Sequence, residues 1–401
     1  MLERTDLRRP AFAAITVAGT NGKGSTVAML EAILRAAGYR VGAYTSPHLI
    51  RYNERVRIDG RLATDAELAA AFERIESARG EVPLTYFEFG TLAAFELFRR
   101  SAIEIAVLEV GMGGRLDAVN GIDADVAVVT SVGIDHTHWL GATRAEIGYE
   151  KAGVFRAARP AICADPDPPA TLVAHAEDIG ARLLIRERDF FIERDPHRPQ
   201  DGWTWKFGGI VRAGLPYPAL RGEYQLDNAA GALTALETLR DRFPVSQGDI
   251  RQGLLQATVP GRFQVLPGSP VRVLDVAHNA DAARALAATL ARQRVAGETF
   301  AVFGILKDKD IVAVAQALRP LVDRWYVATL HTARGASVEE IRAALAAAGV
   351  GAPVAAFDEM RVAYAAACRD AGAADRVVVF GSFYTVGDIL AALPEGAGDG
   401  R

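Results

Sequence analysis

The sequence is poor in cysteine, lacks long apolar runs and has no excess of positive charge. Its two cysteines, Cys163 and Cys368, are far apart and form no CxxC motif, which argues against a disulfide framework or a zinc cluster and fits a reducing compartment. No apolar stretch reaches the ~18 residues of a membrane span, and residues 1–10 lack the apolar core of a signal peptide. The formal net charge of -4 argues against a dedicated nucleic-acid-binding protein. We therefore expect a cytoplasmic protein that binds neither membranes nor nucleic acid.

The composition indicates a folded chain with large cores. Its 401 residues suggest two or three domains. Half of the residues are hydrophobic and 23% are charged, which excludes extensive disorder. Short apolar runs alternate with Ala/Leu-rich helical patterns, and this alternation is typical of parallel α/β sheets.

The alternation predicts two successive α/β domains. The first has predicted strands at 15–18, 40–44, 103–110 and 126–132, and predicted helices at 24–37, 224–240 and 247–257. After a Pro/Gly break at 258–262, the second has predicted strands at 271–276, 299–304, 324–328 and 376–380, and helices at 280–292, 309–319, 337–348 and 358–371. We therefore predict an α/β fold, with a P-loop-type, mostly parallel sheet domain (1–257) followed by a smaller Rossmann-like α/β domain (258–401). Residues 186–222 are predicted to form a small antiparallel excursion, and the tail after Pro394 to be frayed.

A glycine-rich loop, Gly19-Thr-Asn-Gly-Lys-Gly-Ser-Thr26, joins the first predicted strand to the first helix. Backbone N–H groups of such a loop bind phosphate oxygens, and Lys23 is placed to reach the β- and γ-phosphates. The spacing differs from GxxxxGK[ST], because Val17 stands at the first glycine position and Gly24 follows the lysine. A plain glycine-rich turn is the alternative, but the embedded lysine and hydroxyls favour nucleotide binding.

Polar residues end several of the predicted strands. Glu109 follows the run 105–108, Ser46 follows the strand at 40–44, and Asp135 and His136 lie after the strand at 126–132. Ligands of parallel sheets bind beyond the carboxyl ends of the strands, so these groups would converge beside the nucleotide and supply ligands for Mg²⁺. By itself, His136 also fits a hydrogen-bonded structural histidine, and Lys151 an ordinary surface lysine at a helix end.

The second half repeats the pattern of an apolar strand that ends in polar groups. The strand at 271–276 runs through Asp275 to His278 and Asn279, which predicts a ligand site at an interdomain cleft. Ser382 follows the strand at 376–380, where it is either part of a site or simply the N-cap of the next helix.

These motifs resemble those of the Mur-ligase superfamily and, within it, the folylpolyglutamate synthase/dihydrofolate synthase family. The resemblance is closest to the bifunctional bacterial form and extends over residues 10–393. It rests on motifs that occur in order along the chain: Gly19–Ser25, Ser46-Pro-His48, Leu84-Thr-Tyr-Phe-Glu-Phe-Gly90, Leu108-Glu-Val-Gly-Met-Gly-Gly-Arg-Leu-Asp117, Asp135-His136, Glu150-Lys-Ala-Gly153 and Asp275-Val-Ala-His-Asn279.

The resemblance implies an ATP-dependent ligase that joins glutamate to a folate carboxylate. ATP would be held by Thr20, Asn21, Gly22, Lys23, Gly24, Ser25, Asn228, Arg262 and Asp275. Two Mg²⁺ ions would be bound by Ser46, Glu109, His136 and a Lys151 carbamylated by CO₂. The catalytic residues would be Lys23, Lys151 and His136. The pterin side would be formed by Thr85, Tyr86, Phe87, Glu88, Leu116, Asp117 and Ala118, and the incoming glutamate would be bound by Arg55, His278 and Ser382.

The implied substrates are dihydropteroate, tetrahydrofolate with its polyglutamates, and L-glutamate, and the implied state is a monomer. Relatives usually have a longer segment before the first strand, part of which holds the pterin, so we expect the affinity for dihydropteroate to be affected more than that for ATP. Folylpolyglutamate synthase activity alone is the nearest alternative. A peptidoglycan Mur ligase is disfavoured, because that group has a nucleotide-sugar-binding domain before the phosphate loop and only 18 residues precede Gly19. A nucleotide-dependent switch protein would explain the loop but not Asp275, His278 and Asn279.

Overall fold

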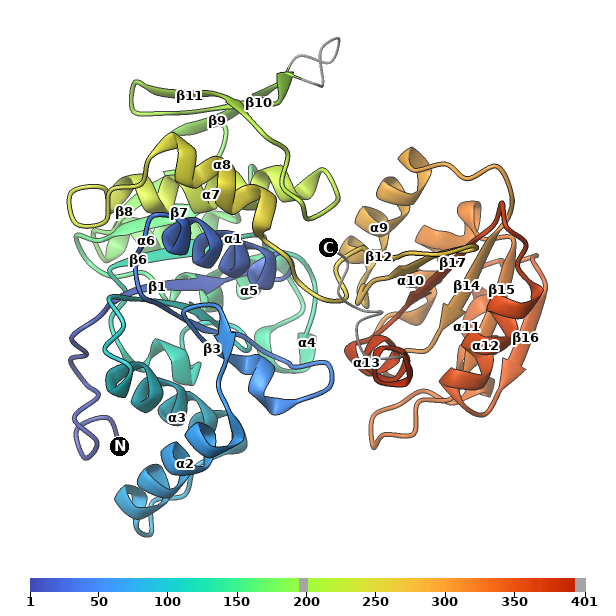
Figure 1. Cartoon of the computed structure of the whole chain (residues 1–401), viewed down its shortest axis with the longest axis horizontal. Helices are drawn as coiled ribbons and strands as arrows, with labels where there is room; N and C mark the ends of the chain where they lie inside the picture. Colours follow the sequence, from blue (N-terminus) through green and yellow to red (C-terminus); the bar gives the residue numbers. More distant parts are fainter. Residues whose placement is uncertain (195–200, 394–401) are drawn as a thin grey trace. The chain divides into compact units, whose positions relative to one another are not determined.

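The computed structural model describes residues 1–194 and 201–393, so the predicted frayed tail after Pro394 lies outside the described residues. The chain divides into two compact units (Figure 1). The first comprises Met1–Ala219 and Tyr224–Thr258, and the second Leu220–Glu223 and the residues from Val259 onwards. Within the described residues, no helix is both long enough and apolar enough to cross a membrane.

The first unit is built on an eight-stranded sheet with the order β4-β3-β2-β5-β1-β6-β7-β8. Six neighbouring strands, β2, β5, β1, β6, β7 and β8, are parallel, whereas β3 and β4 add an antiparallel hairpin at one edge. The strands are β1 (Ala13–Ala18), β2 (Val41–Tyr44), β3 (Val56–Ile58), β4 (Arg61–Leu62), β5 (Ile105–Glu109), β6 (Val126–Val129), β7 (Pro160–Cys163) and β8 (Arg182–Ile185).

Strand β1 lies at the point where the strand order reverses, with β5 on one side and β6 on the other. Every residue of β1, β2, β5 and β6 is buried, as expected for strands covered by helices on both faces. Because ligands of open α/β sheets bind outside the carboxyl ends of the strands at this reversal, the loop after β1 is placed at the preferred binding edge.

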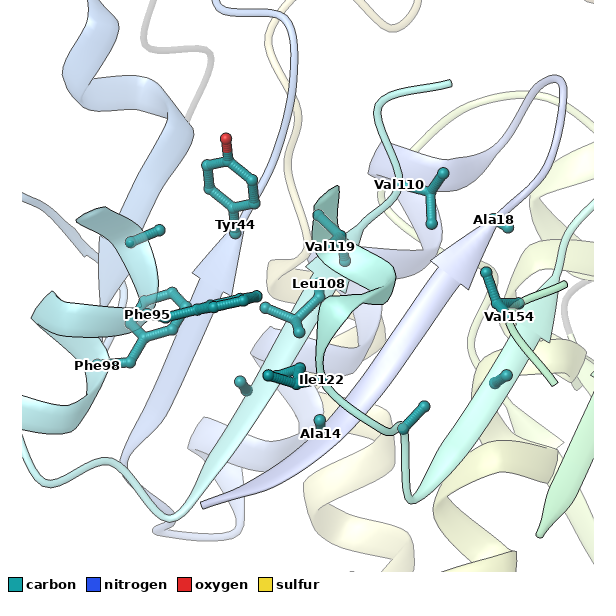
Figure 2. Close-up of a cluster of buried hydrophobic side chains, with 14 of the residues drawn as sticks. Ala14, Ala18, Tyr44, Phe95, Phe98, Leu108, Val110, Val119, Ile122 and Val154 are labelled. Carbon is teal, nitrogen blue, oxygen red and sulfur yellow. The ribbon is translucent and has the colours of Figure 1, made fainter. Parts of the chain in front are cut away.

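Helices cover both faces of this sheet. Helices α1 and α7 pack on one face with α8 against α1, while α2, α3, α5 and α6 contribute side chains to the core on the other face (Figure 1). Figure 2 shows part of the core on this α2–α3 face of the first unit, where Phe95 and Phe98 lie beside Tyr44, Leu108 and Ile122. The helices are α1 (Lys23–Ala36), α2 (Asp65–Arg79), α3 (Tyr86–Arg100), α4 (Thr137–Leu140), α5 (Arg144–Ala152), α6 (Ala170–Asp178), α7 (Tyr224–Thr238) and α8 (Gln247–Gln256), with short 3₁₀ turns η1 (Tyr52–Arg55) and η2 (Ala118–Gly121).

Between β8 and α7 the chain forms a three-stranded antiparallel sheet of β9 (Phe190–Arg194), β10 (Trp203–Phe207) and β11 (Ile210–Leu215). Trp203 and Trp205 of β10 are buried, and the indole of Trp205 donates a hydrogen bond to Thr234 Oγ1 of α7 at 3.2 Å. This contact attaches the small sheet to the helical face of the first unit.

The second unit has a six-stranded sheet with the order β12-β13-β17-β14-β15-β16, in which only the β12–β13 pair is antiparallel. Its core includes Phe303, Trp325 and Phe380, whose rings contact one another. The elements are β12 (Gln264–Leu266), β13 (Val271–Leu274), β14 (Thr299–Phe303), β15 (Arg324–Ala328), β16 (Val354–Phe357), β17 (Arg376–Phe380), α9 (Ala280–Arg292), α10 (Ile311–Leu318), α11 (Val338–Ala347), α12 (Met360–Asp370) and α13 (Phe383–Ala392).

The observed architecture confirms the predicted α/β class, the mostly parallel sheets and the antiparallel excursion within 186–222. The strands at 324–328 and 376–380 and the helix at 280–292 have the predicted bounds. The strands predicted at 40–44, 103–110, 126–132, 271–276 and 299–304 are too long, and the one predicted at 15–18 is too short, since β1 begins at Ala13. At Thr130 and Asp275 the chain leaves the sheet where its polar residues begin.

Candidate active site

The loop after β1 is held open by two glycines that no other residue could replace without a collision. Gly19 and Gly22 have φ of +148° and +91°. A Cβ on Gly19 would lie 1.9 Å from Thr130 Oγ1, and a Cβ on Gly22 would lie 2.3 Å from Asn228 Oδ1. Thr130 Oγ1 in turn donates to the carbonyl of Asn21 at 2.6 Å. The loop is therefore fitted closely against the end of β6 and against helix α7.

Hydrogen bonds to the segment after β6 fix the remaining loop residues. Thr20 exchanges bonds with Gly133, since its hydroxyl donates to the carbonyl at 3.1 Å and accepts from the N–H at 2.9 Å. The N–H of Thr20 donates to Ser131 O at 2.8 Å, and that of Asn21 to Ser131 Oγ at 3.1 Å. This network presents the N-terminus of α1 at the carboxyl edge of the sheet, where its N–H groups favour an anion.

Lys23 and Ser25 lie in the first turn of α1. The Lys23 ammonium folds back over the loop and donates to the carbonyls of Gly19 and Thr20 at 3.0 and 3.3 Å. Ser25 is buried and accepts a hydrogen bond from Gln225 Nε2 at 3.2 Å, while Gln225 Oε1 accepts from Asn228 Nδ2 at 2.9 Å. Asn228 was predicted as a nucleotide contact from the resemblance alone. In the structure its side chain lies directly beside Gly22 of the phosphate loop.

Glu109 and Ser46 are brought together at the ends of neighbouring strands. Glu109 is the last residue of β5, pairs in register with Val17 of β1 and is only 4% exposed. Its Oε2 accepts a hydrogen bond from the backbone N–H of Ser46 at 3.0 Å. The buried carboxylate of Glu109 therefore lies next to the strand that leads into the phosphate loop, and Ser46 is in direct contact with this carboxylate.

His136 begins the short helix α4 in a left-handed conformation (φ 54°, ψ 39°). Its backbone N–H donates to Asp135 Oδ1 at 2.8 Å, and its Nε2 lies 4.0 Å from Asp135 Oδ2. The imidazole is 36% exposed, so its ring is partly open to solvent rather than enclosed in the core.

Lys151 is buried in helix α5, which contradicts the alternative of an ordinary surface lysine. Desolvation, followed by the positive charge of Lys23, lowers the pKa of Lys151 to about 7, while the charge of Asp135 opposes the shift. The backbone of Glu150 and Lys151 packs against Gly114, because a Cβ there would lie 2.8 and 2.9 Å from their carbonyl oxygens. Since Lys23 and Asp135 both act on its charge, Lys151 belongs electrostatically to the phosphate-loop region.

Two of the predicted metal ligands, Glu109 and Ser46, match the preferences of Mg²⁺. Glu109 supplies a carboxylate and Ser46 a hydroxyl, and Mg²⁺ commonly takes one or two carboxylates together with phosphate oxygens and waters. Among residues 1–194 and 201–393, no group of three or more His, Cys, Asp or Glu forms a cluster that would hold a metal by itself. The predicted set contains only two such residues, so it fits a site that substrate phosphates complete.

A cavity of about 410 Å³ opens beside the predicted pterin-side residues. Glu88 and Ala118 line it, together with N-terminal residues that include Met1, Leu2 and Arg8. Asp117 caps η2 by accepting from Val119 N at 2.9 Å, and its pKa is raised by burial although Lys23 opposes this. The neighbouring Leu116 is 80% exposed.

The predicted segment Thr85–Glu88 divides between several roles in the structure. Thr85 and Glu88 form a capping box at the start of α3, with Thr85 N to Glu88 Oε2 at 2.7 Å and Glu88 N to Thr85 Oγ1 at 3.2 Å. Phe87 lies under Gly111, where a Cβ would come within 2.5 Å of its ring. Tyr86 is exposed, and its ring lies against the guanidinium of Arg55.

The predicted residues of the second unit gather at the ends of β13 and β17. Asp275 is buried and accepts hydrogen bonds from the N–H groups of Phe263 and Ala277, each at 2.8 Å; desolvation raises its pKa, and Arg262 and His278 oppose this. Arg262 lies over the Phe383 ring at 4.9 Å. Because a carbonyl only accepts, the 2.8 Å contact with Val276 O places a proton on His278 Nδ1.

Ser382 is the N-cap of α13, accepting from Thr385 N at 2.9 Å, so the N-cap prediction is confirmed and a role in glutamate binding stays a prediction. Two residues that shape these sites were missed from the sequence, Gln225 and Phe383, whereas Thr130 was expected only as one of the polar groups at the end of its strand. Each of the three acts through a contact with a residue distant in sequence or with a predicted site residue, and only Thr130, at a strand end, carried a sequence signal.

Most of the chain matches known protein families. Residues 17–185 match the family described as Mur ligase middle domain, and residues 261–383 match Mur ligase, glutamate ligase domain. The dihydrofolate synthase/folylpolyglutamate synthase of Escherichia coli (strain K12) is 44% identical over 390 residues, which cover 97% of this chain and 89% of the relative.

Solved structures are similar over the same length. Escherichia coli FolC in complex with DHPP and ADP superimposes with a TM-score of 0.91 at 43% identity, covering 97% of this chain and 90% of the other. A bifunctional folylpolyglutamate synthase/dihydrofolate synthase with Mn, AMPPNP and L-glutamate bound gives a TM-score of 0.90 at 47% identity, covering 98% and 92%. These similarities agree with a phosphate loop beside a carboxylate that suits a divalent cation.

Proposed function

Because the chain belongs to the dihydrofolate synthase/folylpolyglutamate synthase family of Mur ligases, we propose that it ligates L-glutamate to dihydropteroate, giving dihydrofolate, and to tetrahydrofolate and its polyglutamates. Members of this family are ATP-dependent ligases that form amide bonds. The observation that carries the proposal is the phosphate loop at the strand-order reversal, with Lys23 folded over it and Glu109 at the end of the adjacent strand.

The chemistry requires activation of a carboxylate. A carboxylate is a poor electrophile, so the acceptor first takes the γ-phosphoryl group of ATP to become an acyl phosphate, and ADP leaves. The glutamate amine then attacks the acyl carbon, loses a proton, and phosphate departs from the tetrahedral intermediate. When bound, Mg²⁺ neutralises the charge of the transferring phosphoryl group.

The residues of the first unit have separate tasks in this reaction. The N-terminus of α1, presented by the loop Thr20–Ser25, is proposed to hold the phosphates, and Lys23 adds positive charge where negative charge develops. Glu109, Ser46 and His136 would hold two Mg²⁺ ions, and His136 and Lys151 join Lys23 as the proposed catalytic residues. Asn228 contacts the loop at Gly22, and Arg262 and Asp275 are proposed nucleotide contacts of the second unit.

Lys151 is proposed to carry a carbamate. Its neutral amine attacks the carbon of CO₂ and releases one proton, which converts a cationic side chain into an anionic metal ligand. Two observations support this: the side chain is buried beside a site that needs negative charge, and desolvation lowers the pKa of the amine to about 7, which leaves a large neutral fraction at neutral pH.

Substrate sites are assigned on both units. The cavity lined by Glu88 and Ala118 is proposed for the pterin, with Thr85, Tyr86, Phe87, Leu116 and Asp117 around it, and Arg55, His278 and Ser382 for glutamate. Residues 1–257 are proposed as the ATP-binding domain and residues 258–401 as the glutamate-ligase domain, supported by the two family matches. We further propose a cytoplasmic monomer.

Phosphate release from Mg-ATP tests the proposal directly, with L-glutamate and either dihydropteroate or tetrahydrofolate as acceptor. We expect turnover with both acceptors, and mass spectrometry should show one added glutamate in each product. Turnover with tetrahydrofolate alone would restrict the activity to folylpolyglutamate synthesis. ATP hydrolysis indifferent to folate and glutamate would contradict a ligase and favour a nucleotide-dependent switch.

A further inference from the structure

Among the residues that the structure describes, Arg55 is a buried cation without a carboxylate partner. Its residue is 8% exposed at the end of η1. Within residues 1–194 and 201–393, Arg55 forms no ion pair, and the carboxylate of the adjacent Glu54 is occupied by the N–H groups of Leu49, Ile50 and Arg51 at 2.7–2.8 Å. A buried guanidinium is stable only when it is well paired, so this one is suited to bind an anion that the described part of the chain does not supply.

Neutral groups surround the guanidinium and fix its orientation. Arg55 Nε donates to His48 Nδ1 at 2.9 Å, and a second hydrogen bond joins Arg55 to Tyr44. The rings of Tyr52 and Tyr86 each lie 5.5 Å from its Cζ, within the range of cation–π attraction. A guanidinium has five N–H donors, more than these two acceptors use, which leaves donors for a ligand.

The guanidinium is placed close to the reacting groups. The backbone carbonyl of Arg55 accepts from Thr45 N at 2.9 Å, and the next residue, Ser46, donates to Glu109 Oε2. The cage formed by His48, Tyr52 and Tyr86 around Arg55 is therefore built on the same strand end as the proposed metal ligand. An anion bound there would lie beside the site of acyl phosphate formation.

Tyr86 connects this cage to helix α3. The capping box of Thr85 and Glu88 fixes the first turn of α3, and Tyr86 is the first residue of that helix. Its ring also contacts Tyr52 with centroids 6.0 Å apart, although the residue is 65% exposed. The exposed ring thus covers a buried cation instead of contributing to the hydrophobic core.

We propose that Tyr86, Tyr52 and His48 are positioning residues that hold the Arg55 guanidinium for a carboxylate of the incoming amino acid. The inference rests on the proposed function and deepens it, because it transfers Tyr86 from the pterin side to the amino-acid side of the reaction. The aromatic rings attract the guanidinium but carry no negative charge that would neutralise it. The positive charge of Arg55 is therefore not offset before the substrate carboxylate binds.

The test compares Tyr86→Leu with Tyr86→Phe in the full chain. Tyr86→Leu removes the aromatic face and should raise the KM for L-glutamate on the order of three- to thirty-fold, the range that one cation–π contact represents. Phe restores the face and should restore the KM. The KM values for ATP and for the folate acceptor, and kcat, should stay within about twofold. Tyr217→Leu, at another exposed tyrosine, is the matched control.

Two amino-acid analogues identify the carboxylate. L-Glutamine lacks the γ-carboxylate and isoglutamine lacks the α-carboxylate, and each is measured as a competitor of L-glutamate. The analogue that lacks the carboxylate held by Arg55 should bind equally to the parent and to Tyr86→Leu. If both analogues lose affinity in the variant as L-glutamate does, Arg55 holds neither carboxylate and the inference is wrong.

Other outcomes separate the inference from the proposed function. An increased KM for the acceptor with an unchanged KM for glutamate would return Tyr86 to the pterin side and overturn the inference alone. The inference is also overturned if Tyr86→Phe raises the KM for L-glutamate as much as Tyr86→Leu does. In that case the hydroxyl of Tyr86, and not its aromatic face, would be responsible for the effect. ATP turnover by the parent that ignores glutamate would overturn the proposed function and the inference together.

Discussion

A lysine amine reacts with carbon dioxide only in its neutral form, and for Lys151 burial supplies that form. Composition alone does not distinguish Lys151 from an ordinary solvated lysine at a helix end, and only the resemblance carried by Glu150-Lys-Ala-Gly153 implies a carbamate there. In the structure, Lys151 is only 3% exposed, and the loop that contains Gly114 packs on the carbonyls of Glu150 and Lys151. A local sequence pattern does not contain such a contact between segments that are far apart in the chain.

Lys151→Ala should reduce kcat by about two to three orders of magnitude, because the proposed group is an anion that binds the metal. Short carboxylic acids should partly restore the activity of Lys151→Ala, since a free carboxylate can occupy the vacated position. Lys151→Arg keeps a positive charge but cannot form the carbamate, so it should stay inactive. Steady-state rates with added formate or acetate measure this, and a fully active Lys151→Arg would exclude the carbamate.

Gly22→Ala should weaken ATP binding about tenfold or more, because the new Cβ would lie 2.3 Å from Asn228 Oδ1 and displace the loop. Gly38→Ala is a well-matched control. Its φ of +88° is nearly that of Gly22 at +91°, so both variants have the same backbone strain, but nothing lies within 4 Å of a Cβ at position 38. Equal losses of ATP affinity in the two variants would show that strain, not the collision, is responsible.

At the scale of elements, helix α2 begins with a capping box that also contains an ion pair. Thr64 N donates to Glu67 Oε2 at 2.8 Å, and Arg61 pairs with Glu67 at 2.6 Å. These bonds, with that of Arg61 the largest, lower the pKa of Glu67 to about 2. The stabilisation is thus present above the unfolded pKa near 4.5 and is lost as the pH falls towards about 2.

Glu67→Gln keeps the capping hydrogen bond but removes the charge. We expect it to lower the free energy of unfolding by less than about 1 kcal/mol near neutral pH, because the pair is partly exposed to solvent. The difference between the parent and Glu67→Gln should shrink as the pH falls below about 4. Urea titrations at several pH values measure this, and a difference independent of pH would assign the effect to packing.

The sequence predicted the central elements better than the peripheral ones. Strands such as β1 and β5 are buried throughout, so each can be recognised from its own apolar run without any information about the neighbouring strands. The hairpin of β3 and β4 and the strands β7 and β8 were not predicted. β3, β4 and β8 have polar or exposed residues, whereas β7 is a short, mostly buried run that begins with Pro160. Their place in the sheet depends on pairing with strands already formed, which a local pattern does not contain.

The site divides in the same way. The phosphate loop and Glu109 were predicted because each directly follows an apolar strand. The proximity of Tyr86 to Arg55, and of Asn228 to Gly22, depends on how α3 and α7 pack, and motif spacing alone could not give either contact. Ser382 and Asn279 show the converse, since both serve as N-caps whatever else they bind.

At the scale of the whole molecule, a nucleotide that binds only the folded chain should stabilise it. At a concentration of Mg-AMPPNP about a hundred times its dissociation constant, linkage predicts about 2.7 kcal/mol. For units of this size that corresponds to a rise of roughly 5–10 °C in the unfolding temperature of the first unit. Calorimetry measures the shift, and Lys23→Ala should largely abolish it. An equal shift in Lys23→Ala would show that the nucleotide binds elsewhere.

The two-residue strand β4, with both residues exposed and Arg61 tied to Glu67, closes one side of the large sheet. An edge so short offers a newly synthesised neighbouring chain almost no row of amide groups on which to grow. During synthesis in a crowded cell, where many identical chains are incompletely folded at once, the hairpin therefore acts as a terminator of cross-chain β-pairing on this side. The ion pair between Arg61 and Glu67 connects this short edge to the first turn of helix α2, so one contact supports both the start of the helix and the end of the sheet.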